Sequence, residues 1–243
     1  MEHRVVSHEE WLAMRMAHLE DEKAFTRQKD KLLEARRALP WVKVEKSYVF
    51  DGPKGSVALS ELFEGRRQLL VQHFMLGPDW TEGCAGCSFQ ADHVDAARQH
   101  FEQADLSFAA VSRAPYDRIA AFKKRMGWSF PWVSSAGNDF NYDYHVSFRE
   151  DELKRGEAFY NYRTIDPGID ELPGQSVFYK DDDGTIYHTY SSYARGGEEL
   201  IGAFNYLDMV PKGRNEPDSI MQWVRHHDRY EDAKGGRCCT AAE

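Results

Sequence analysis

The sequence predicts an α/β protein with a central mixed sheet flanked by helices, preceded by a long N-terminal helix and interrupted by an insertion before a C-terminal hairpin. Residues 7–38 contain neither Gly nor Pro, as expected of one long helix. Residues 68–134 alternate near-continuous apolar runs with helical patterns, which is typical of parallel strands joined by helical crossovers. Residues 176–190 contain two strand-like runs around an Asp-Asp-Asp-Gly turn, which predicts the hairpin.

The N-terminal helix begins with Ser7 and Glu10, the Ser-x-x-Glu spacing of a capping box. Its apolar residues are sparse among many charges. We therefore expect a helical arm over residues 1–40, lying on the main domain or against a second copy of the chain. A homodimer formed through this helix is thus one expectation.

The main domain is expected over residues 41–232, with an insertion of loops and short helices at about 137–173 and a flexible tail at 233–243. Near-continuous apolar runs identify strands that are buried on both faces. In chain order, the expected elements are strands at 41–44 and 48–50, a helical turn near Ser60, a strand at 68–76, a helix at 88–103, a strand at 106–111, a helix at 115–126, a strand at 130–134, the hairpin, and a helix at 197–207.

Composition narrows the range of partners. The 243 residues are 42% hydrophobic and 13% aromatic, as in a globular protein, and the net charge is −9. This charge disfavours nucleic acids and anionic membranes, because both are polyanions. No apolar run approaches the ~20 residues that span a bilayer, and the first residues lack a signal-peptide core. We expect a cytoplasmic protein, in a compartment that keeps thiols reduced.

Cys84 and Cys87 form a Cys-x-x-Cys pair between a buried strand and a helix. Cys84 is expected at the helix N-terminus, where free N–H groups and the helix dipole stabilise a thiolate. Cys87 lies one turn further on the same face, within disulfide reach. This arrangement predicts a dithiol redox site in which Cys84 is the nucleophile and Cys87 resolves the mixed disulfide. Because Asp79 and Glu82 lie just upstream, we expect only modest activation of Cys84.

Two alternatives to a redox pair stay open at this stage. The cysteines, with His93, could bind a soft metal, although structural zinc usually requires four ligands and the sequence offers no second pair of suitable spacing. The same fold could instead be a non-catalytic interaction module. No glycine-rich nucleotide-binding motif occurs, so no cofactor is expected and no resident metal is assigned. Cys238 and Cys239 read as incidental thiols of the tail.

Several segments carry a family resemblance. Residues 57–84 and 111–132 resemble the thioredoxin superfamily, particularly its alkyl-hydroperoxide-reductase/thiol-specific-antioxidant branch. Three segments more narrowly resemble a bacterial family of thioredoxin-like proteins that are described as predicted dithiol-disulfide oxidoreductases. These are residues 74–80, residues 176–179 with 188–191, and residues 223–228. The resemblance covers about residues 5–230 and implies a thioredoxin-like fold and thiol chemistry on protein or small-molecule disulfides, without indicating a particular substrate.

Two departures from the superfamily bear on the site. Thioredoxins carry a cis-proline directly before the strand that faces the active site, whereas here Gln175 and Ser176 precede Val177, with Pro173 further upstream. Gln175 and Ser176 are therefore the candidate substrate-binding residues, together with Trp80 in the loop before the pair.

The second departure concerns peroxidase chemistry. Peroxiredoxins carry Pro-x-x-x-Thr/Ser-x-x-Cys. Counted from Pro78, Glu82 takes the hydroxyl position and Ala85 the cysteine position. Peroxidase activity of the usual kind is thereby disfavoured.

Overall fold

The computed structural model describes residues 3–230. The chain forms two compact units, which meet at Pro40 and Trp41 in the sequence. The expected tail, with Cys238 and Cys239, lies outside the described residues. No helix in residues 3–230 combines the length and the apolar character needed to cross a membrane.

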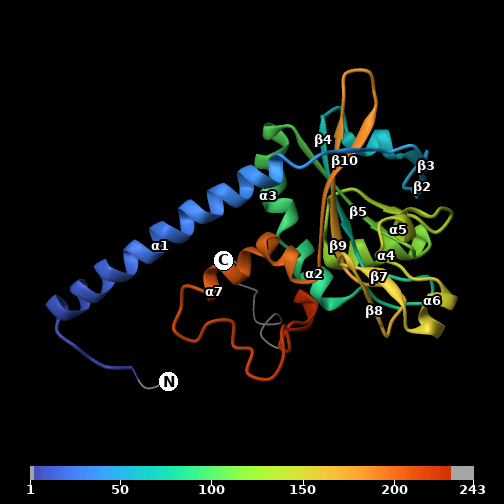
Figure 1. Cartoon of the computed structure of the whole chain (residues 1–243). Coiled ribbons are helices and arrows are strands. Elements are labelled where there is room, and N and C mark those ends of the chain that lie inside the picture. Colours follow the sequence, from blue (N-terminus) through green and yellow to red (C-terminus); the bar gives the residue numbers. More distant parts are fainter. Residues whose placement is uncertain (1–2, 231–243) are drawn as a thin grey trace, which may run out of the picture. The chain divides into compact units, whose positions relative to one another are not determined.

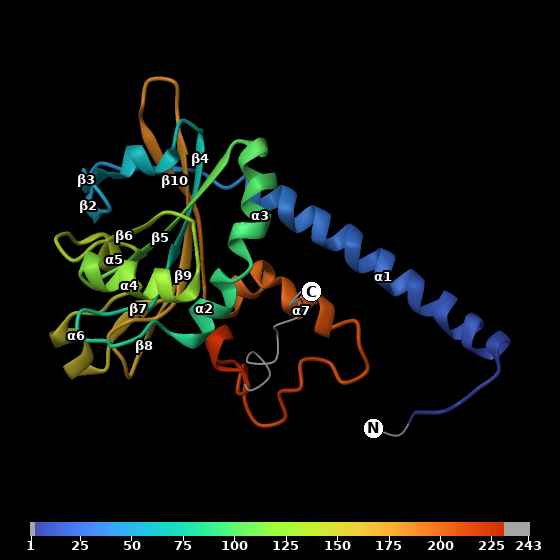
Figure 2. The same ribbon diagram turned by 180° about the vertical axis from the view of Figure 1, so that it is seen from behind.

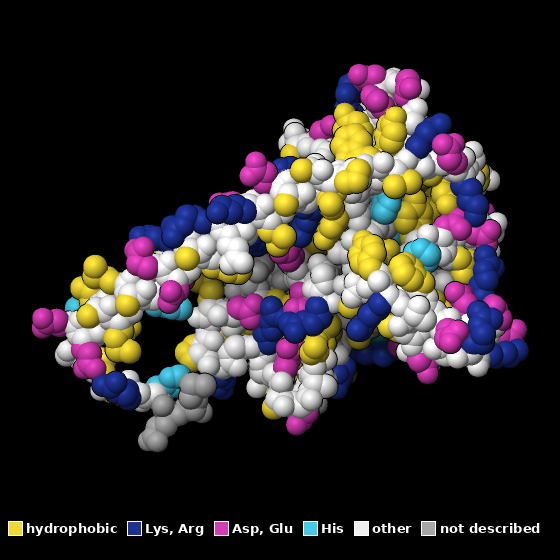
Figure 3. Space-filling view, viewed as in Figure 1, with side chains coloured by type: hydrophobic (Ala, Val, Ile, Leu, Met, Phe, Trp, Pro, Cys, Tyr) yellow, Lys and Arg dark blue, Asp and Glu magenta, His cyan; other side chains and the backbone are white. Residues whose placement is uncertain are grey.

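The first unit is dominated by helix α1 (His8–Arg37). Its N-cap is Ser7, whose hydroxyl accepts the backbone N–H of Glu10 at 3.1 Å, as the capping-box spacing predicts. Acidic residues in the first turn and basic residues in the last turn complement the helix dipole. Exposed apolar side chains lie along this helix among charged ones (Figure 3).

The second unit is built on an eight-stranded mixed sheet with the order β1-β10-β9-β4-β5-β6-β2-β3 (Figure 1). Strands β4, β5 and β6 are parallel, and the antiparallel hairpin β9–β10 adds to the other side of β4. The strands are β1 (Val42–Lys43), β2 (Val49–Gly52), β3 (Gly55–Ala58), β4 (Gln68–His73), β5 (Leu106–Ser112), β6 (Trp132–Ser134), β9 (Gly174–Lys180) and β10 (Ile186–Tyr193). This is a thioredoxin-like arrangement, and the predicted fold class is confirmed.

Helices α2 (Ala85–Ala91) and α3 (Val94–Phe101) join β4 to β5, and α4 (Tyr116–Met126) joins β5 to β6. Both views show α3 continuing from α2 along the sheet (Figure 1 and Figure 2). The single helix expected over residues 88–103 is thus wrong in detail, since it starts earlier and is interrupted at Asp92 and His93. The His93 N–H bonds the carbonyl of Gln90, three residues back, so the helix tightens at this point.

The helix expected at 197–207 is also divided, into a 3₁₀ segment, η3 (Ala194–Leu200), and α7 (Gly202–Leu207). Between them Ile201 has an extended backbone. The ring nitrogen Nε2 of His93 accepts the N–H of Ala203 at 3.0 Å and so caps the first turn of α7. A tertiary hydrogen bond therefore sets this break, which local sequence could not reveal.

The insertion contains the short helices α5 (Phe140–Asp143) and α6 (Glu150–Arg155), and also a small hairpin that the sequence did not predict, β7 (Ala158–Tyr160) with β8 (Arg163–Ile165). The two residues that connect these strands, Asn161 and Tyr162, both have positive φ, of 49° and 62°. Such a turn usually carries glycine at its second position. Because Tyr162 stands there, nothing in the sequence indicated this hairpin.

The sheet separates two apolar clusters because successive strand residues point to opposite faces. In β5, Phe108 and Ala110 pack with Cys87 and the residues of α4, whereas Ala109 and Val111 pack on the other face with Phe140 and its neighbours. A 3₁₀ turn, η1 (Leu59–Phe63), also contributes to the second cluster. The first cluster positions the start of α2 and therefore the two cysteines.

Candidate functional site

The Cys-x-x-Cys pair lies where the sequence placed it, between a central strand and a helix. After β4 ends at His73, the chain runs through a loop to Cys84, which is the N-cap of α2, and its N–H bonds the carbonyl of Met75 at 3.0 Å. Cys84 is partly exposed and Cys87 is 5% exposed, and both are free thiols. A hydrogen bond joins their side chains.

The loop before Cys84 is fixed by close packing and by a buried histidine. A side chain at Gly83 would come within 2.6 Å of the Phe74 ring and 2.8 Å of the Phe122 ring, so glycine permits this approach. The carbonyl of Gly83 accepts a hydrogen bond from Nε2 of His226 at 2.8 Å. The ring therefore carries a proton on Nε2, which it donates to this carbonyl. His226 is only 5% exposed, although it stands in a run of charged residues.

The thiol of Cys84 is strongly activated. Its pKa falls from 9.0 to about 6, mainly because the Cys87 side chain hydrogen-bonds to the sulfur and also because the N–H groups of Cys87 and Gly86 favour the thiolate, while burial opposes the shift. These N–H groups do not form a regular capping hydrogen bond with the sulfur. At a pKa of about 6, the thiol is about 90% thiolate at pH 7.

This activation exceeds the modest effect expected from the sequence. Glu82, which was expected to oppose the thiolate, forms ion pairs with Arg125 (2.7 Å) and Arg229, so its charge is compensated. The hydrogen bond from Cys87 adds a stabilisation that a helix terminus alone does not supply.

Cys87 shows the opposite shift. Its pKa lies well above 9.0 because its proton is held in the hydrogen bond to Cys84, because it is buried, and because the charges of Cys84 and Glu171 disfavour a second anion. The pair therefore holds one thiolate, on Cys84, and one proton, on Cys87. Such a division is what nucleophilic attack by Cys84 requires.

Glu171 is a residue of this site that sequence reasoning missed. It is 1% exposed, and its Oε1 accepts a hydrogen bond from Nε of Arg113 at 2.8 Å. Its second carboxylate oxygen, Oε2, is buried without a hydrogen-bond partner among the described residues. Burial raises the pKa of Glu171 to about 7, although Arg113 opposes the shift. Near neutral pH it can therefore gain or lose a proton.

A cavity of about 270 Å³ opens over the cysteines. Segments from α2, from the start of β9, from η3 and from the C-terminal region surround it. Its lining consists of Cys84, Gly86, Cys87, Gln90, Pro173, Gln175, Ala194, Arg195, Gly197, Glu198, Ile201, Ile220 and Met221.

Of the five residues predicted for the site, Cys84, Cys87 and Gln175 line this cavity. Trp80 lies outside the lining and packs against the first apolar cluster. Ser176 is also outside it, fully buried in β9, where it hydrogen-bonds to His73 and Ser191. The binding roles assigned to Trp80, Gln175 and Ser176 stay predictions.

Strand β9 begins two residues earlier than expected, at Gly174, so Pro173 directly precedes it. Pro173 lines the same cavity as the two cysteines. The sequence suggested that this chain, unlike thioredoxins, has no proline directly before the strand that faces the site. This is wrong in part, since Pro173 does stand directly before β9. All peptide bonds in the described part of the chain are trans, including the one at this proline.

Comparison with known proteins identifies the family. A family model described as "Bacterial protein of unknown function (DUF899)" matches residues 1–230. The chain belongs to this family. No curated protein matches it.

Solved structures similar to this DUF899 protein include the peroxidoxin BcpB from Mycobacterium tuberculosis, with 12% identity and a TM-score of 0.46 over 70% of this chain and 97% of the other. A peroxiredoxin Q mutant from Xanthomonas campestris has 14% identity and a TM-score of 0.43 over 65% and 90%. A putative protein disulfide isomerase from Bacteroides thetaiotaomicron has 17% identity and a TM-score of 0.38 over 73% and 96%. At these levels, similarity says nothing about activity.

A metal site in this DUF899 protein would lack its third expected ligand. The Nε2 atom of His93 accepts the N–H of Ala203, and its Nδ1 bonds the carbonyl of Phe89 at 2.8 Å, so both ring nitrogens are occupied. In residues 3–230, no three His, Cys, Asp or Glu side chains gather as they would around a metal ion.

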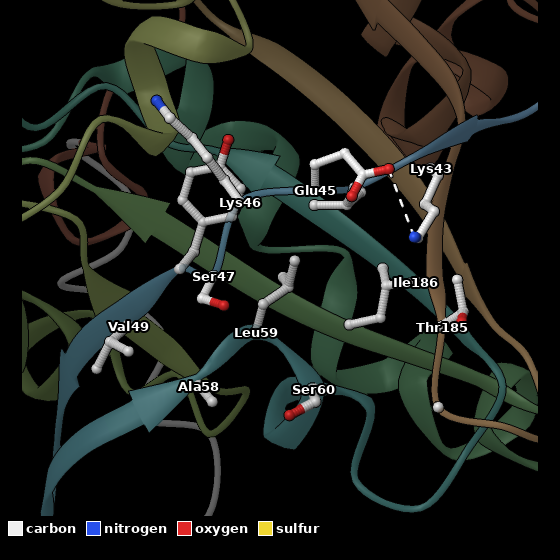
Figure 4. Close-up of a pocket in the computed structure, with 13 residues that line it drawn as sticks. Lys43, Glu45, Lys46, Ser47, Val49, Ala58, Leu59, Ser60, Thr185 and Ile186 are labelled. Carbon is white, nitrogen blue, oxygen red and sulfur yellow. Dashed lines mark ion pairs between the residues drawn. The ribbon is translucent and has the colours of Figure 1, made fainter.

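A second cavity, of about 250 Å³, lies near the other end of the sheet, between residues 43–49, residues 58–60 and residues 184–186 (Figure 4). Its charged side chains are paired, Lys43 with Glu45 at 3.5 Å and Lys46 with Asp143 at 2.6 Å. No cysteine lines it. The cavity over Cys84 and Cys87 is therefore the better candidate for chemistry.

Proposed function

We propose that this protein is a thiol–disulfide oxidoreductase in which Cys84 is the attacking nucleophile and Cys87 the resolving thiol. One observation carries the proposal: two hydrogen-bonded thiols with opposite pKa shifts, lowered at Cys84 and raised at Cys87, line the same cavity. A purely structural pair of buried thiols gains nothing from a thiolate. Perturbed titration of groups in a cavity is a physical sign of a functional site.

In the first step, the Cys84 thiolate attacks one sulfur of a substrate disulfide. The substrate S–S bond breaks, a bond forms between Cys84 and that sulfur, and the other half leaves as a thiolate that takes a proton from solvent. The product is a mixed disulfide. Because Cys84 is no longer a thiolate, it accepts the hydrogen bond from Cys87 less strongly and its charge no longer disfavours ionisation of Cys87.

In the second step, Cys87 loses its proton and attacks the sulfur of Cys84. The mixed disulfide breaks, the second half of the substrate leaves as a thiolate that takes a proton from solvent, and Cys84 and Cys87 become a disulfide. Glu171 is the proton acceptor that we assign to Cys87, since its charge acts on that thiol, its buried Oε2 has no hydrogen-bond partner among the described residues, and its pKa is about 7. Two electrons pass to the substrate, and an external thiol reductant returns the pair to the dithiol.

The partner that we propose is a protein or small-molecule disulfide encountered in the cytoplasm. Peroxide is a disfavoured substrate. Glu82 stands where peroxiredoxins carry a hydroxyl, and its carboxylate is held in ion pairs with Arg125 and Arg229. It therefore cannot serve as the hydroxyl donor that this position supplies in peroxiredoxins. The occupied ring of His93 leaves the metal-binding alternative without support from its third ligand.

The proposal is tested by single-turnover reduction of a model disulfide. Pre-reduced protein is mixed with bis(hydroxyethyl) disulfide, and the thiols on the protein and in solution are counted. We expect the loss of two protein thiols for each disulfide reduced, a new disulfide between Cys84 and Cys87, and no reaction in Cys84→Ser. Reaction at an unchanged rate in Cys84→Ser would refute the assignment.

A further inference from the structure

Gln90 lines the cavity over the cysteines, and its amide nitrogen is a buried polar group without a hydrogen-bond partner among the described residues. Gln90 is 6% exposed, its Oε1 accepts a hydrogen bond from Nε2 of Gln175 at 3.0 Å, and its own Nε2 has no partner among the described residues. Burial of an unsatisfied N–H group is unfavourable. A donor retained in this state beside two cysteines is therefore suited to an acceptor that a ligand supplies.

A short chain of hydrogen bonds orients this donor. The hydroxyl of Ser192 donates to Oε1 of Gln175 at 3.0 Å, and Nε2 of Gln175 then donates to Oε1 of Gln90. The NH₂ group of Gln90 is left free. Gly197 makes room for this arrangement, since a side chain there would lie 2.6 Å from Nε2 of Gln175. Gln175 is thus a positioning residue, and Gln90 is the residue that would touch the ligand.

The rest of the lining indicates a small and mostly apolar ligand. Its walls include Pro173, Ile201 and Met221, and its two charged side chains, Arg195 and Glu198, pair with each other at 2.8 Å. At about 270 Å³ the cavity is below the ~300–1,000 Å³ of pockets for drug-sized molecules. Because side chains from four segments of the chain line the cavity around the pair, a small disulfide fits this site better than the surface of a folded protein.

We infer that the substrate is a low-molecular-weight disulfide that carries a carbonyl or carboxylate oxygen a few bonds from its sulfur, and that Nε2 of Gln90 donates a hydrogen bond to that oxygen. Gln90 follows Cys87 by three residues and so shares its face of α2. This inference rests on the proposed function and adds to it the substrate class and the residue that selects it. The reaction is the exchange already described: one substrate disulfide becomes two thiols, and the cysteines become a disulfide.

The experiment compares three small disulfides that differ in polarity: dithiodipropionate, which has carboxylates, cystamine, which has ammonium groups, and diethyl disulfide, which has neither. Single-turnover rates are measured with pre-reduced full-length protein and divided by the rate of each disulfide with a free dithiol. The variants are Gln90→Leu, which removes the donor, and Gln90→Glu, which keeps an acceptor for Gln175 but replaces the donor. The control is Gln103→Leu, at an exposed glutamine.

We expect dithiodipropionate to react fastest with the wild type. In Gln90→Leu the ratio of the dithiodipropionate rate to the diethyl disulfide rate should fall about ten- to a hundred-fold, the range for a lost hydrogen bond to a charged group. Gln90→Glu should shift the preference to cystamine, and Gln103→Leu should leave the ratio unchanged.

Three outcomes would overturn the inference alone: an unchanged ratio in Gln90→Leu, a wild-type preference for cystamine, or faster reduction of a disulfide on a folded protein than of dithiodipropionate. Failure of the wild type to reduce any disulfide would instead refute the proposed function, and the inference with it.

Discussion

The carboxylate of Glu171 lies close enough to the thiol of Cys87 to add to the rise in its pKa that the hydrogen bond to Cys84 and burial mainly cause, and both residues are almost fully buried. They come from distant parts of the sequence, Cys87 from α2 and Glu171 from the end of the insertion. Arg113 donates a hydrogen bond to one oxygen of the carboxylate, and the other oxygen has no hydrogen-bond partner in residues 3–230. The resolving thiol is thus provided with a nearby group that titrates near neutral pH.

Glu171→Gln should slow the resolving step. With a pKa of about 7, Glu171 is a carboxylate above this pH and can accept a proton only in that form, so the wild-type rate should rise as the pH increases through about 7. The variant should lose this inflection and resolve on the order of 10² times more slowly at pH 8. The measurement is release of the second thiol from the Cys84 mixed disulfide across pH. Glu157→Gln, at an exposed position, is the control, and an unchanged profile in Glu171→Gln would remove the proton-acceptor role.

Removal of the Cys87 thiol should raise the pKa of Cys84. The hydrogen bond from Cys87 is the largest cause of the low value of about 6, so Cys87→Ala should move the pKa toward 9.0. The ultraviolet absorbance of the thiolate, titrated against pH, measures this shift. Cys87→Ser should also trap a mixed disulfide with substrate, whereas Cys84→Ser should not. If Cys84→Ser traps it instead, the two roles are reversed.

His73 should make the protein sensitive to acid. Burial, aided by His188, lowers the pKa of His73 from 6.5 to about 3, so below pH 6.5 the unfolded chain binds a proton that the folded chain excludes. Stability is therefore lost as the pH falls from 6.5 toward 3, by about 3 kcal/mol at pH 4. Urea unfolding of the wild type and of His73→Gln, each at pH 7 and at pH 4, measures this loss of stability.

The difference in the free energy of unfolding between pH 7 and pH 4 should be about 3 kcal/mol smaller in His73→Gln than in the wild type. It should stay the same in His100→Gln, where the histidine is exposed. Comparison of these differences cancels the opposite contribution of Glu171, whose raised pKa favours the folded state as the pH falls through 7. Equal pH dependence in the wild type and in His73→Gln would show that His73 is not the acid-sensitive group.

Gly83→Ala should destabilise the loop that carries Cys84. The new methyl group would meet the rings of Phe74 and Phe122 at 2.6 and 2.8 Å, and such overpacking costs about 1–3 kcal/mol. Gly137→Ala is the matched control, because no atom lies within 4 Å of the added carbon there, and it should change stability by less than about 1 kcal/mol. Thermal unfolding measures the stability of both variants. Equal stabilities of Gly83→Ala and Gly137→Ala would argue against the tight packing at Gly83.

The parts of the site that sequence predicted are those with a local pattern. The apolar runs of β4 and β5 and the position of the cysteine pair between strand and helix were sufficient to place Cys84 at the N-terminus of α2. Glu171 and Gln90 gave no such signal. Each is a single polar residue whose burial and partners depend on packing between segments far apart in the chain.

Two further misjudgements have the same origin. His226 belongs to a run of charged residues, yet the fold buries it against the loop of Gly83. The sequence places the start of the facing strand after Pro173 by several residues, whereas β9 begins at Gly174, directly after that proline. The lack of a side chain at Gly174 allows its close contact with Tyr193 and Val146. Neither contact can be inferred from neighbouring residues alone.

The central claim, that Cys84 and Cys87 exchange two electrons with thiols and disulfides, is tested most directly by redox equilibrium. The protein is equilibrated with thiol–disulfide buffers of graded ratio, the remaining thiols are alkylated, and the oxidised fraction of each cysteine is measured by peptide mass spectrometry. We predict a single two-electron transition in which Cys84 and Cys87 are oxidised together, to a disulfide with each other. Absence of that disulfide at every buffer ratio, or oxidation of Cys84 without Cys87, would contradict the account.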